Sequence, residues 1–132
     1  MEIEFSEVDI ARDRTTLVEL LCFDDWPFHG SRTIAVEDID SMEFKSPDVS
    51  SYWIMVSGQP VGLIRLLDLG DIGRGAAQFD LRVSSEHRRR GVGTQATRWI
   101  VAHLFSSHPE LHRIEANTRH DNIGMQRALQ AT

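Results

Sequence analysis

Residues 79–94 read FDLRVSSEHRRRGVGT, and this stretch decides the fold. Residues 79–83 alternate between apolar and polar, so the apolar ones share one face of a predicted strand. A turn crowded with arginine and glycine follows. Beyond the turn, apolar residues recur every four positions, which is typical of an amphipathic helix that ends near Phe105. The sequence therefore predicts a strand, a short turn and a helix that packs on the sheet.

The turn at residues 88–94 has the features of an anion-binding site. The first backbone N–H groups of a helix have no partners within the helix, and the helix dipole favours negative charge there. Gly91 and Gly93 let phosphate oxygens approach these donors, and the three preceding arginines add charge-assisted contacts. A Walker loop and a dinucleotide fingerprint are both excluded by the spacing. A solvated arginine run and a nucleic-acid patch remain as alternatives.

The flanking segments predict a mixed sheet. Residues 3–5 alternate as a short strand, and residues 52–56 and 61–67 form two strands of a hairpin around Gly58-Gln59-Pro60. A further strand at residues 113–118 follows the helix, and this order implies a crossover onto a parallel neighbour. The expected fold class is α/β (α+β by some schemes), with a mixed, mainly antiparallel sheet and flanking helices.

Three more helices are expected. Capping residues and apolar spacing place them at about residues 15–22, 35–44 and 121–129. Thr15 or Thr16 is the expected cap of the first one.

Composition excludes several classes of protein. The 132 residues suit one domain, and the chain is 41% hydrophobic and 26% charged, as is ordinary for a globular protein. Cys22 is the only cysteine, so an internal disulfide is excluded and no metal site is expected. No secretory signal or apolar stretch of ~20 residues is found, so we expect a cytoplasmic protein without a membrane partner. A net charge of −6 argues against nucleic acid as partner.

The arginine-glycine turn also carries a family resemblance. Residues 88–93, RRRGVG, resemble the R/Q-x-x-G-x-G/A signature of the GNAT superfamily of acyl-CoA N-acyltransferases. Residues 113–117, RIEAN, and 121–125, DNIGM, look like the next strand and the asparagine-led helix of that superfamily. The residues of these motifs are most similar to the branch of ribosomal-protein and aminoglycoside acetyltransferases. The resemblance covers essentially the whole chain.

The resemblance implies an N-acetyltransferase with acetyl-CoA as co-substrate and a sheet whose two parallel strands splay apart. Main-chain N–H groups of residues 89–94 would hold the pyrophosphate, and backbone groups of the preceding strand would pair with the pantetheine arm. A small-molecule or peptide amine would attack the thioester directly. The cofactor-binding residues implied are Leu81, Val83, Arg88, Arg89, Arg90, Gly91, Val92, Gly93, Thr94 and Asn122.

The resemblance leaves the acid–base residues more open. Asp80 is the first candidate to take the proton of the amine, and Glu115 is the second. The alternative for Asp80 is a structural salt bridge to Arg82 or Arg65. The tyrosine with which many relatives protonate the thiolate is replaced by Leu129, so the general acid is not identified.

The acceptor amine is expected to lie near the loop after the first helix. Trp26 and His29 offer aromatic contacts there, and Asp71 offers negative charge to an amine. Anchoring of the loop is the alternative for the aromatic residues.

The family pattern continues with further strands after the last helix, where this sequence stops. We therefore expect a single GNAT-like domain over residues 1–132 that is incomplete at its C-terminus. An uncovered sheet edge could pair with a second copy as a homodimer. The competing function is a non-catalytic acyl-CoA-binding module, or a domain that a partner chain completes.

Overall fold

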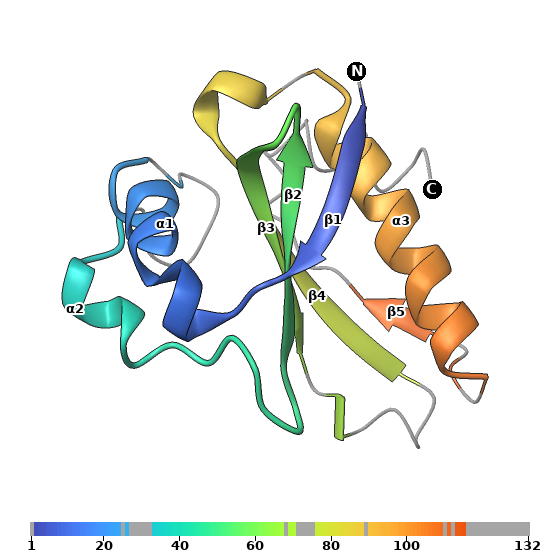
Figure 1. Ribbon diagram of the computed structural model, residues 1–132. Helices are drawn as coiled ribbons and strands as arrows, with labels where there is room; N and C mark the ends of the chain where they lie inside the picture. Colours follow the sequence, from blue (N-terminus) through green and yellow to red (C-terminus); the bar gives the residue numbers. More distant parts are fainter. Residues whose placement is uncertain are drawn as a thin grey trace.

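The computed structural model describes residues 2–24, 26, 33–67, 69–70, 76–88, 90–109, 111 and 113–115. In this part of the chain one five-stranded sheet separates two layers of helices (Figure 1). The strands are β1 (Ile3–Glu7), β2 (Ser50–Val56), β3 (Gln59–Leu67), β4 (Ala76–Val83) and β5 (Arg113–Glu115). The helices are α1 (Ile10–Cys22), α2 (Val36–Ile39) and α3 (Val92–Ser107).

The sheet is mixed, as the sequence predicts. Strands β1 to β4 pair antiparallel in chain order, and β5 pairs with β4 in parallel. The hairpin turn between β2 and β3 lies at Ser57 and Gly58, which have φ angles of 52° and 77°. It therefore comes one residue earlier than expected, since Gln59 and Pro60 already belong to β3. Two consecutive positive φ angles match the right-handed twist of the flanking strands.

Each face of the sheet buries its own hydrophobic cluster. On one face Trp53 and Leu63 pack with Leu17 and Leu21 of α1. On the other face, apolar residues of β3 and β4 pack against α3, among them Ile64 and Phe79 with Ile100. The predicted alternation of β4 is confirmed, because its residues 79 and 81 are buried on the α3 side. The alternation also places Asp80 and Arg82 on the side of α1.

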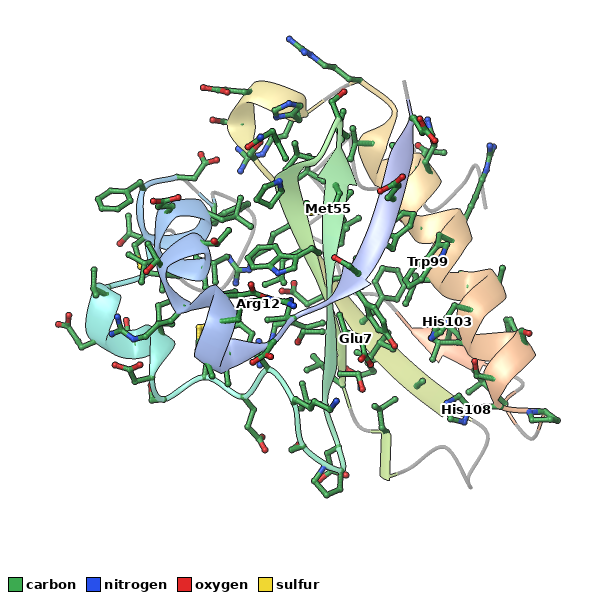
Figure 2. The ribbon with its side chains drawn as sticks, in the orientation of Figure 1. Glu7, Arg12, Met55, Trp99, His103 and His108 are labelled. Carbon is green, nitrogen blue, oxygen red and sulfur yellow. The ribbon has the colours of Figure 1, made fainter. Side chains whose placement is uncertain are left out.

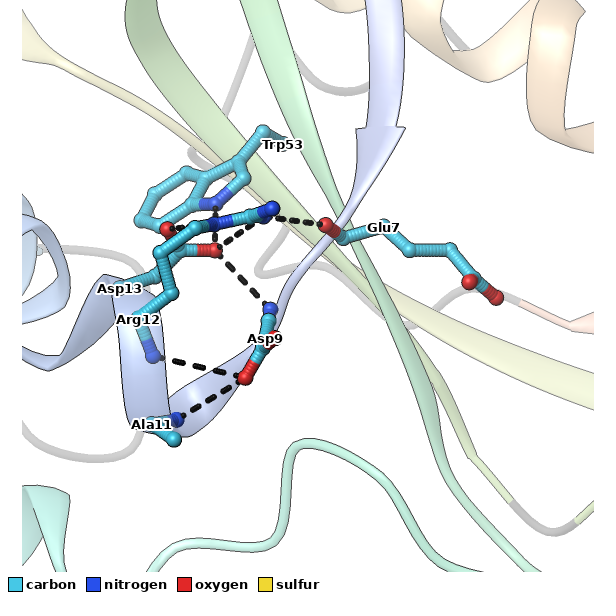
Figure 3. Close-up of polar contacts among 6 residues, drawn as sticks. All are labelled: Glu7, Asp9, Ala11, Arg12, Asp13 and Trp53. Carbon is cyan, nitrogen blue, oxygen red and sulfur yellow. Dashed lines mark hydrogen bonds and ion pairs between the residues drawn. The ribbon is translucent and has the colours of Figure 1, made fainter.

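Helix α1 begins at Ile10, so the expected cap at Thr15 or Thr16 is wrong. Asp9 caps the helix instead, because its Oδ1 accepts from the N–H groups of Ala11 at 3.1 Å and Arg12 at 3.4 Å. These bonds are drawn in Figure 3.

Helix α2 is shorter than the predicted range of residues 35–44. It ends at Ile39, and Phe44 lies beyond it as a buried core residue. The apolar residues in this range therefore indicate buried positions, and they do not belong to one continuous helix.

Aromatic side chains attach α3 to β1 and β2. Trp99 and His103 of α3 lie toward these strands (Figure 2). Trp99 stacks on Phe5 with ring centroids 4.2 Å apart, and His103 stacks on Trp99 at 4.9 Å. The hydroxyl of Tyr52 lies 3.3 Å from Nε2 of His103. These contacts fix the helix that carries the arginine-glycine turn at its start.

The end of the sheet is only partly described. Strand β5 covers the first three residues of the predicted strand 113–118, whereas the predicted helix at 121–129 lies outside the described residues. Among the helices that the structure describes, none is long and apolar enough to cross a membrane.

Candidate active site

The start of α3 presents free backbone donors. Gly91 is the N-cap in the left-handed region, at φ 81° and ψ 0°. The N–H of Gln95 donates to the carbonyl of Gly91 at 3.1 Å, so Gln95 is the first residue bonded back within the helix. The N–H groups of Val92, Gly93 and Thr94 come before it and have no acceptor in the helix. They form the kind of site that binds phosphate.

The two glycines of the turn leave space rather than fill it. Among the described residues, a Cβ atom at Gly93 would meet only Cδ2 of Leu81, at an ordinary contact distance of 3.9 Å. A Cβ atom at Gly91 would meet nothing within 4 Å among the described residues, although its positive φ disfavours other residues. The protein's own packing therefore leaves room at the turn, as close approach of a ligand requires.

The outer edge of β4 leads into this turn. The N–H of Ser84 donates to the carbonyl of Val61 at 2.8 Å, so the backbone groups of Ser84 point toward β3. Because these groups alternate along an antiparallel strand, those of Val83 and Leu81 point the other way. The described pairing with β5 reaches only Gln78. In the part of the chain that the structure describes, no strand therefore pairs with Leu81 and Val83 on that side.

Arg88 makes a contact with this edge. Its Nε–H donates to the carbonyl of Val83 at 2.8 Å. Its guanidinium lies over the indole of Trp26, 5.0 Å from the ring centroid, and the guanidinium of Arg82 lies 5.1 Å from the same ring. The sequence pattern contains no signal for this stack, because Trp26 is far in the chain from Arg82 and Arg88.

Trp26 holds its position as a buried side chain. It is 1% exposed, and its Nε1–H donates to the carbonyl of Leu21 at 3.0 Å. The structure thus gives Trp26 the anchoring role that the sequence left as an alternative. In the same segment, Asp24 accepts from the N–H of Ser85 at 2.8 Å. The loop after α1 is thereby attached to the turn before α3.

Asp80 pairs with Arg82 on the α1 side of β4. Nε of Arg82 lies 3.3 Å from Oδ2 of Asp80, and the two side chains are 11% and 26% exposed. Burial lowers the pKa of Arg82. Its buried Nη1 has no hydrogen-bond partner in the described structure. The salt bridge to Arg82, one of the two considered for Asp80, is thus present. Arg65 lies opposite Asp80 in the register of β3 and β4, and its guanidinium donates to the carbonyl of Glu43.

Arg82 is the residue of this site that sequence reasoning did not single out as functional. The alternation of β4 gives the signal, because it puts positions 80 and 82 on one face.

The remaining predicted residues are placed only in part. Glu115 lies in β5 opposite Gln78, and Arg90 is exposed in the turn before α3. The other predicted residues lie outside the described part of the chain: His29, Asp71, Arg89 and Asn122.

Comparison with known proteins agrees with this arrangement. The model of the acetyltransferase (GNAT) family matches residues 14–131. Comparison with curated proteins gave no significant match.

Solved structures share the fold. An aminoglycoside acetyltransferase in complex with ribostamycin and coenzyme A is 19% identical, covering 99% of this chain and 82% of that one with a TM-score of 0.81. A spermidine N-acetyltransferase chimera from Vibrio cholerae and hSSAT is 13% identical, covering 98% and 78% with a TM-score of 0.79. A GNAT-family acetyltransferase from Streptococcus pneumoniae is 12% identical, covering 98% and 82% with a TM-score of 0.72.

Proposed function

Because the chain belongs to the acetyltransferase (GNAT) family, with acetyl-CoA as acetyl donor, we propose that it acetylates a primary amine of a small molecule or peptide by direct attack on the thioester. The observation that carries this proposal is the arrangement at the end of β4. There the backbone edge at Leu81 and Val83, with which no described strand pairs, leads directly into the glycine-capped start of α3. One linear ligand with an amide-rich arm and a pyrophosphate fits both features.

Each part of this edge has a proposed role toward the donor. The backbone groups of Leu81 and Val83 bond the amides of the pantetheine arm. The N–H groups at the start of α3 hold the pyrophosphate, and the exposed Arg90 adds positive charge. The roles of Arg89 and Asn122 stay predictions from the sequence.

Acetyl-CoA, when bound, supplies an activated thioester, so the chain has to provide an oriented, deprotonated amine. We assign the removal of the amine's proton to Asp80, directly or through a water molecule, with Glu115 as second candidate. Nε of Arg82 lies 3.3 Å from Oδ2 of this carboxylate, so the proposed base is in contact with a charged partner.

The acceptor we propose is a cationic amine. The chain has a net charge of −6, which favours the approach of cations. Two of the structural neighbours are named for aminoglycoside and spermidine acetylation. His29 and Asp71 remain the predicted acceptor contacts, and Trp26 is a buried anchor in the segment after α1.

Calorimetry with coenzyme A tests donor binding. A thiol-release assay with acetyl-CoA and a panel of polyamines, aminoglycosides and peptides then tests transfer. We expect binding of coenzyme A and thiol release with at least one amine. Absence of binding would contradict the proposed function.

A second candidate function is a coenzyme A-binding module without catalysis. The observation that favours it is the ion pair of Asp80 with Arg82, which engages the proposed base in a structural contact. This module would bind coenzyme A with the same affinity, but no amine of the panel would release thiol.

A further inference from the structure

The carbonyl of Val83 is the acceptor for two different hydrogen-bond donors, one in the structure and one in the proposed complex. In the structure it accepts the Nε–H of Arg88 at 2.8 Å. In the proposed function, on which this inference rests, the same outward-facing edge pairs with the pantetheine arm. The guanidinium takes one of the two acceptor positions of this carbonyl and the space beside it, and thereby competes with an amide N–H that approaches from the same edge.

Arg88 is held firmly enough in this position for the competition to matter. A hydrogen bond from a charged donor is stronger than one between neutral groups. The half-buried side chain also stacks on Trp26, which is itself fixed by its bond to the carbonyl of Leu21. A neutral amide alone is a weak competitor for a carbonyl that already accepts a charged donor.

A phosphate group changes this balance. Arg88 lies three residues before Gly91, at the beginning of the turn that leads to the start of α3. A pyrophosphate at that helix start offers the guanidinium a charge-assisted, bidentate partner in place of the carbonyl. Only an acyl donor that carries the phosphates can replace the hydrogen bond that Arg88 loses when it leaves the carbonyl of Val83.

We propose that Arg88 is a specificity-determining latch for the acyl donor. It closes the backbone edge of β4 at Val83 and opens when a pyrophosphate binds at the start of α3. The chain thereby selects acyl donors that carry a nucleotide pyrophosphate over thioesters of bare pantetheine. No bond is formed or broken in this step other than hydrogen bonds and ion pairs.

Calorimetric titration of the full chain with coenzyme A and with pantetheine tests the latch. The variant Arg88→Met keeps an aliphatic side chain against Trp26 but removes the competing donor. We expect it to bind pantetheine about tenfold more tightly than the wild type, which corresponds to about 1.4 kcal/mol. Its affinity for coenzyme A should fall, because the pyrophosphate loses a partner. Arg98→Met removes one positive charge from an exposed position of α3 and should leave both affinities unchanged.

Two results overturn the latch while leaving the proposed function intact. If Arg88→Met weakens coenzyme A but leaves pantetheine unchanged, Arg88 is a phosphate ligand only. If the variant weakens both ligands, Arg88 is structural. Failure of the wild type to bind coenzyme A instead overturns the proposed function itself, and the latch with it.

A second measurement covers the case in which Arg88→Met does not fold. The ¹⁵N resonance of the Arg88 Nε–H can be followed in the wild type. We expect saturating coenzyme A to move it and an equal concentration of pantetheine to leave it in place. A resonance that does not respond to coenzyme A would overturn the latch.

Discussion

Replacement of Asp13 should destabilise the chain far more than replacement of an exposed carboxylate of similar geometry. Asp13 is 9% exposed and accepts four hydrogen bonds at the junction of β1, α1 and β2 (Figure 3). Two come from Arg12 at 2.9 and 3.0 Å, one from the N–H of Asp9 at 2.9 Å and one from Nε1 of Trp53 at 3.0 Å. Trp53 is itself only 4% exposed, so its indole N–H has no access to water as a replacement.

The magnitude follows from which donors stay buried. In Asp13→Ala the exposed guanidinium of Arg12 turns to water and contributes little to the loss. The buried indole N–H is left without an acceptor at a cost of about 1–3 kcal/mol, and the N–H of Asp9 loses about 1 kcal/mol more. The total loss is about 3 kcal/mol, which lowers the Tm of a chain of this size by roughly 10 °C.

Thermal and urea unfolding of the purified variants measure this loss. Asp40→Ala is the matched control, because Asp40 pairs with Arg14 at 2.8 Å but both side chains are exposed. We expect little change in that variant. In a Trp53→Phe background, Asp13→Ala should cost less, because the donor that it orphans is gone. Equal losses in the Asp13 and Asp40 variants, or strict additivity with Trp53→Phe, would refute this reasoning.

The dependence of stability on pH gives a second test of Asp13. The hydrogen bonds from Arg12 hold the pKa of Asp13 well below its usual range. A carboxyl whose pKa is lower in the folded than in the unfolded chain contributes stability above the unfolded pKa of about 3.9. That contribution is lost as the pH falls below about 4. The free energy of unfolding should therefore drop more steeply with acid in the wild type than in Asp13→Asn, and parallel curves would contradict this assignment.

Three further substitutions test the turn, the sheet and the proposed base. Gly91→Val forces a β-branched residue into φ 81°, so it should lose about 1–2 kcal/mol and bind coenzyme A at least tenfold more weakly in calorimetry, whereas Gly93→Ala should retain stability. Gly62→Ala places a Cβ 2.5 Å from the carbonyl oxygen of Arg82, and urea unfolding should show a loss of about 1–3 kcal/mol. Asp80→Asn should lower turnover in the thiol-release assay by about 10²-fold with coenzyme A affinity nearly unchanged, and wild-type turnover would reassign Asp80 to structure.

The elements with a regular pattern could be predicted from the sequence. Strand β4 and helix α3 alternate or repeat over many residues, so their type and buried faces follow from periodicity alone. The start of α1 could not be fixed in this way, because Asp9, Thr15 and Thr16 are all capable caps. The structure selects Asp9 because β1 ends just before it, at Glu7, and α1 packs Leu17 into the core.

The glycine turn of the candidate site was accessible to sequence reasoning, but the side chains around it were not. Arg88 is the first residue of the family signature. The signature suggests that Arg88 contacts phosphate, but it does not predict the contacts of Arg88 with Val83 and Trp26. The three residues are brought together by the packing of the loop after α1 against the end of β4. Contacts between distant segments depend on tertiary structure, so local sequence patterns do not predict them.

The structural and catalytic interpretations of Asp80 are linked rather than exclusive. The side chain of Arg82 is 11% exposed, with its guanidinium 5.1 Å from the ring centroid of Trp26 and its Nε 3.3 Å from Oδ2 of Asp80. The Asp80 carboxylate therefore offsets part of its desolvation. A proton that reaches Asp80 neutralises this partner and leaves a buried guanidinium uncompensated. In the proposed reaction, a proton taken from the amine would therefore pass on to water or to the leaving thiolate rather than remain on Asp80. An ion pair of this kind suits a carboxylate that relays a proton and does not suit one that stores it.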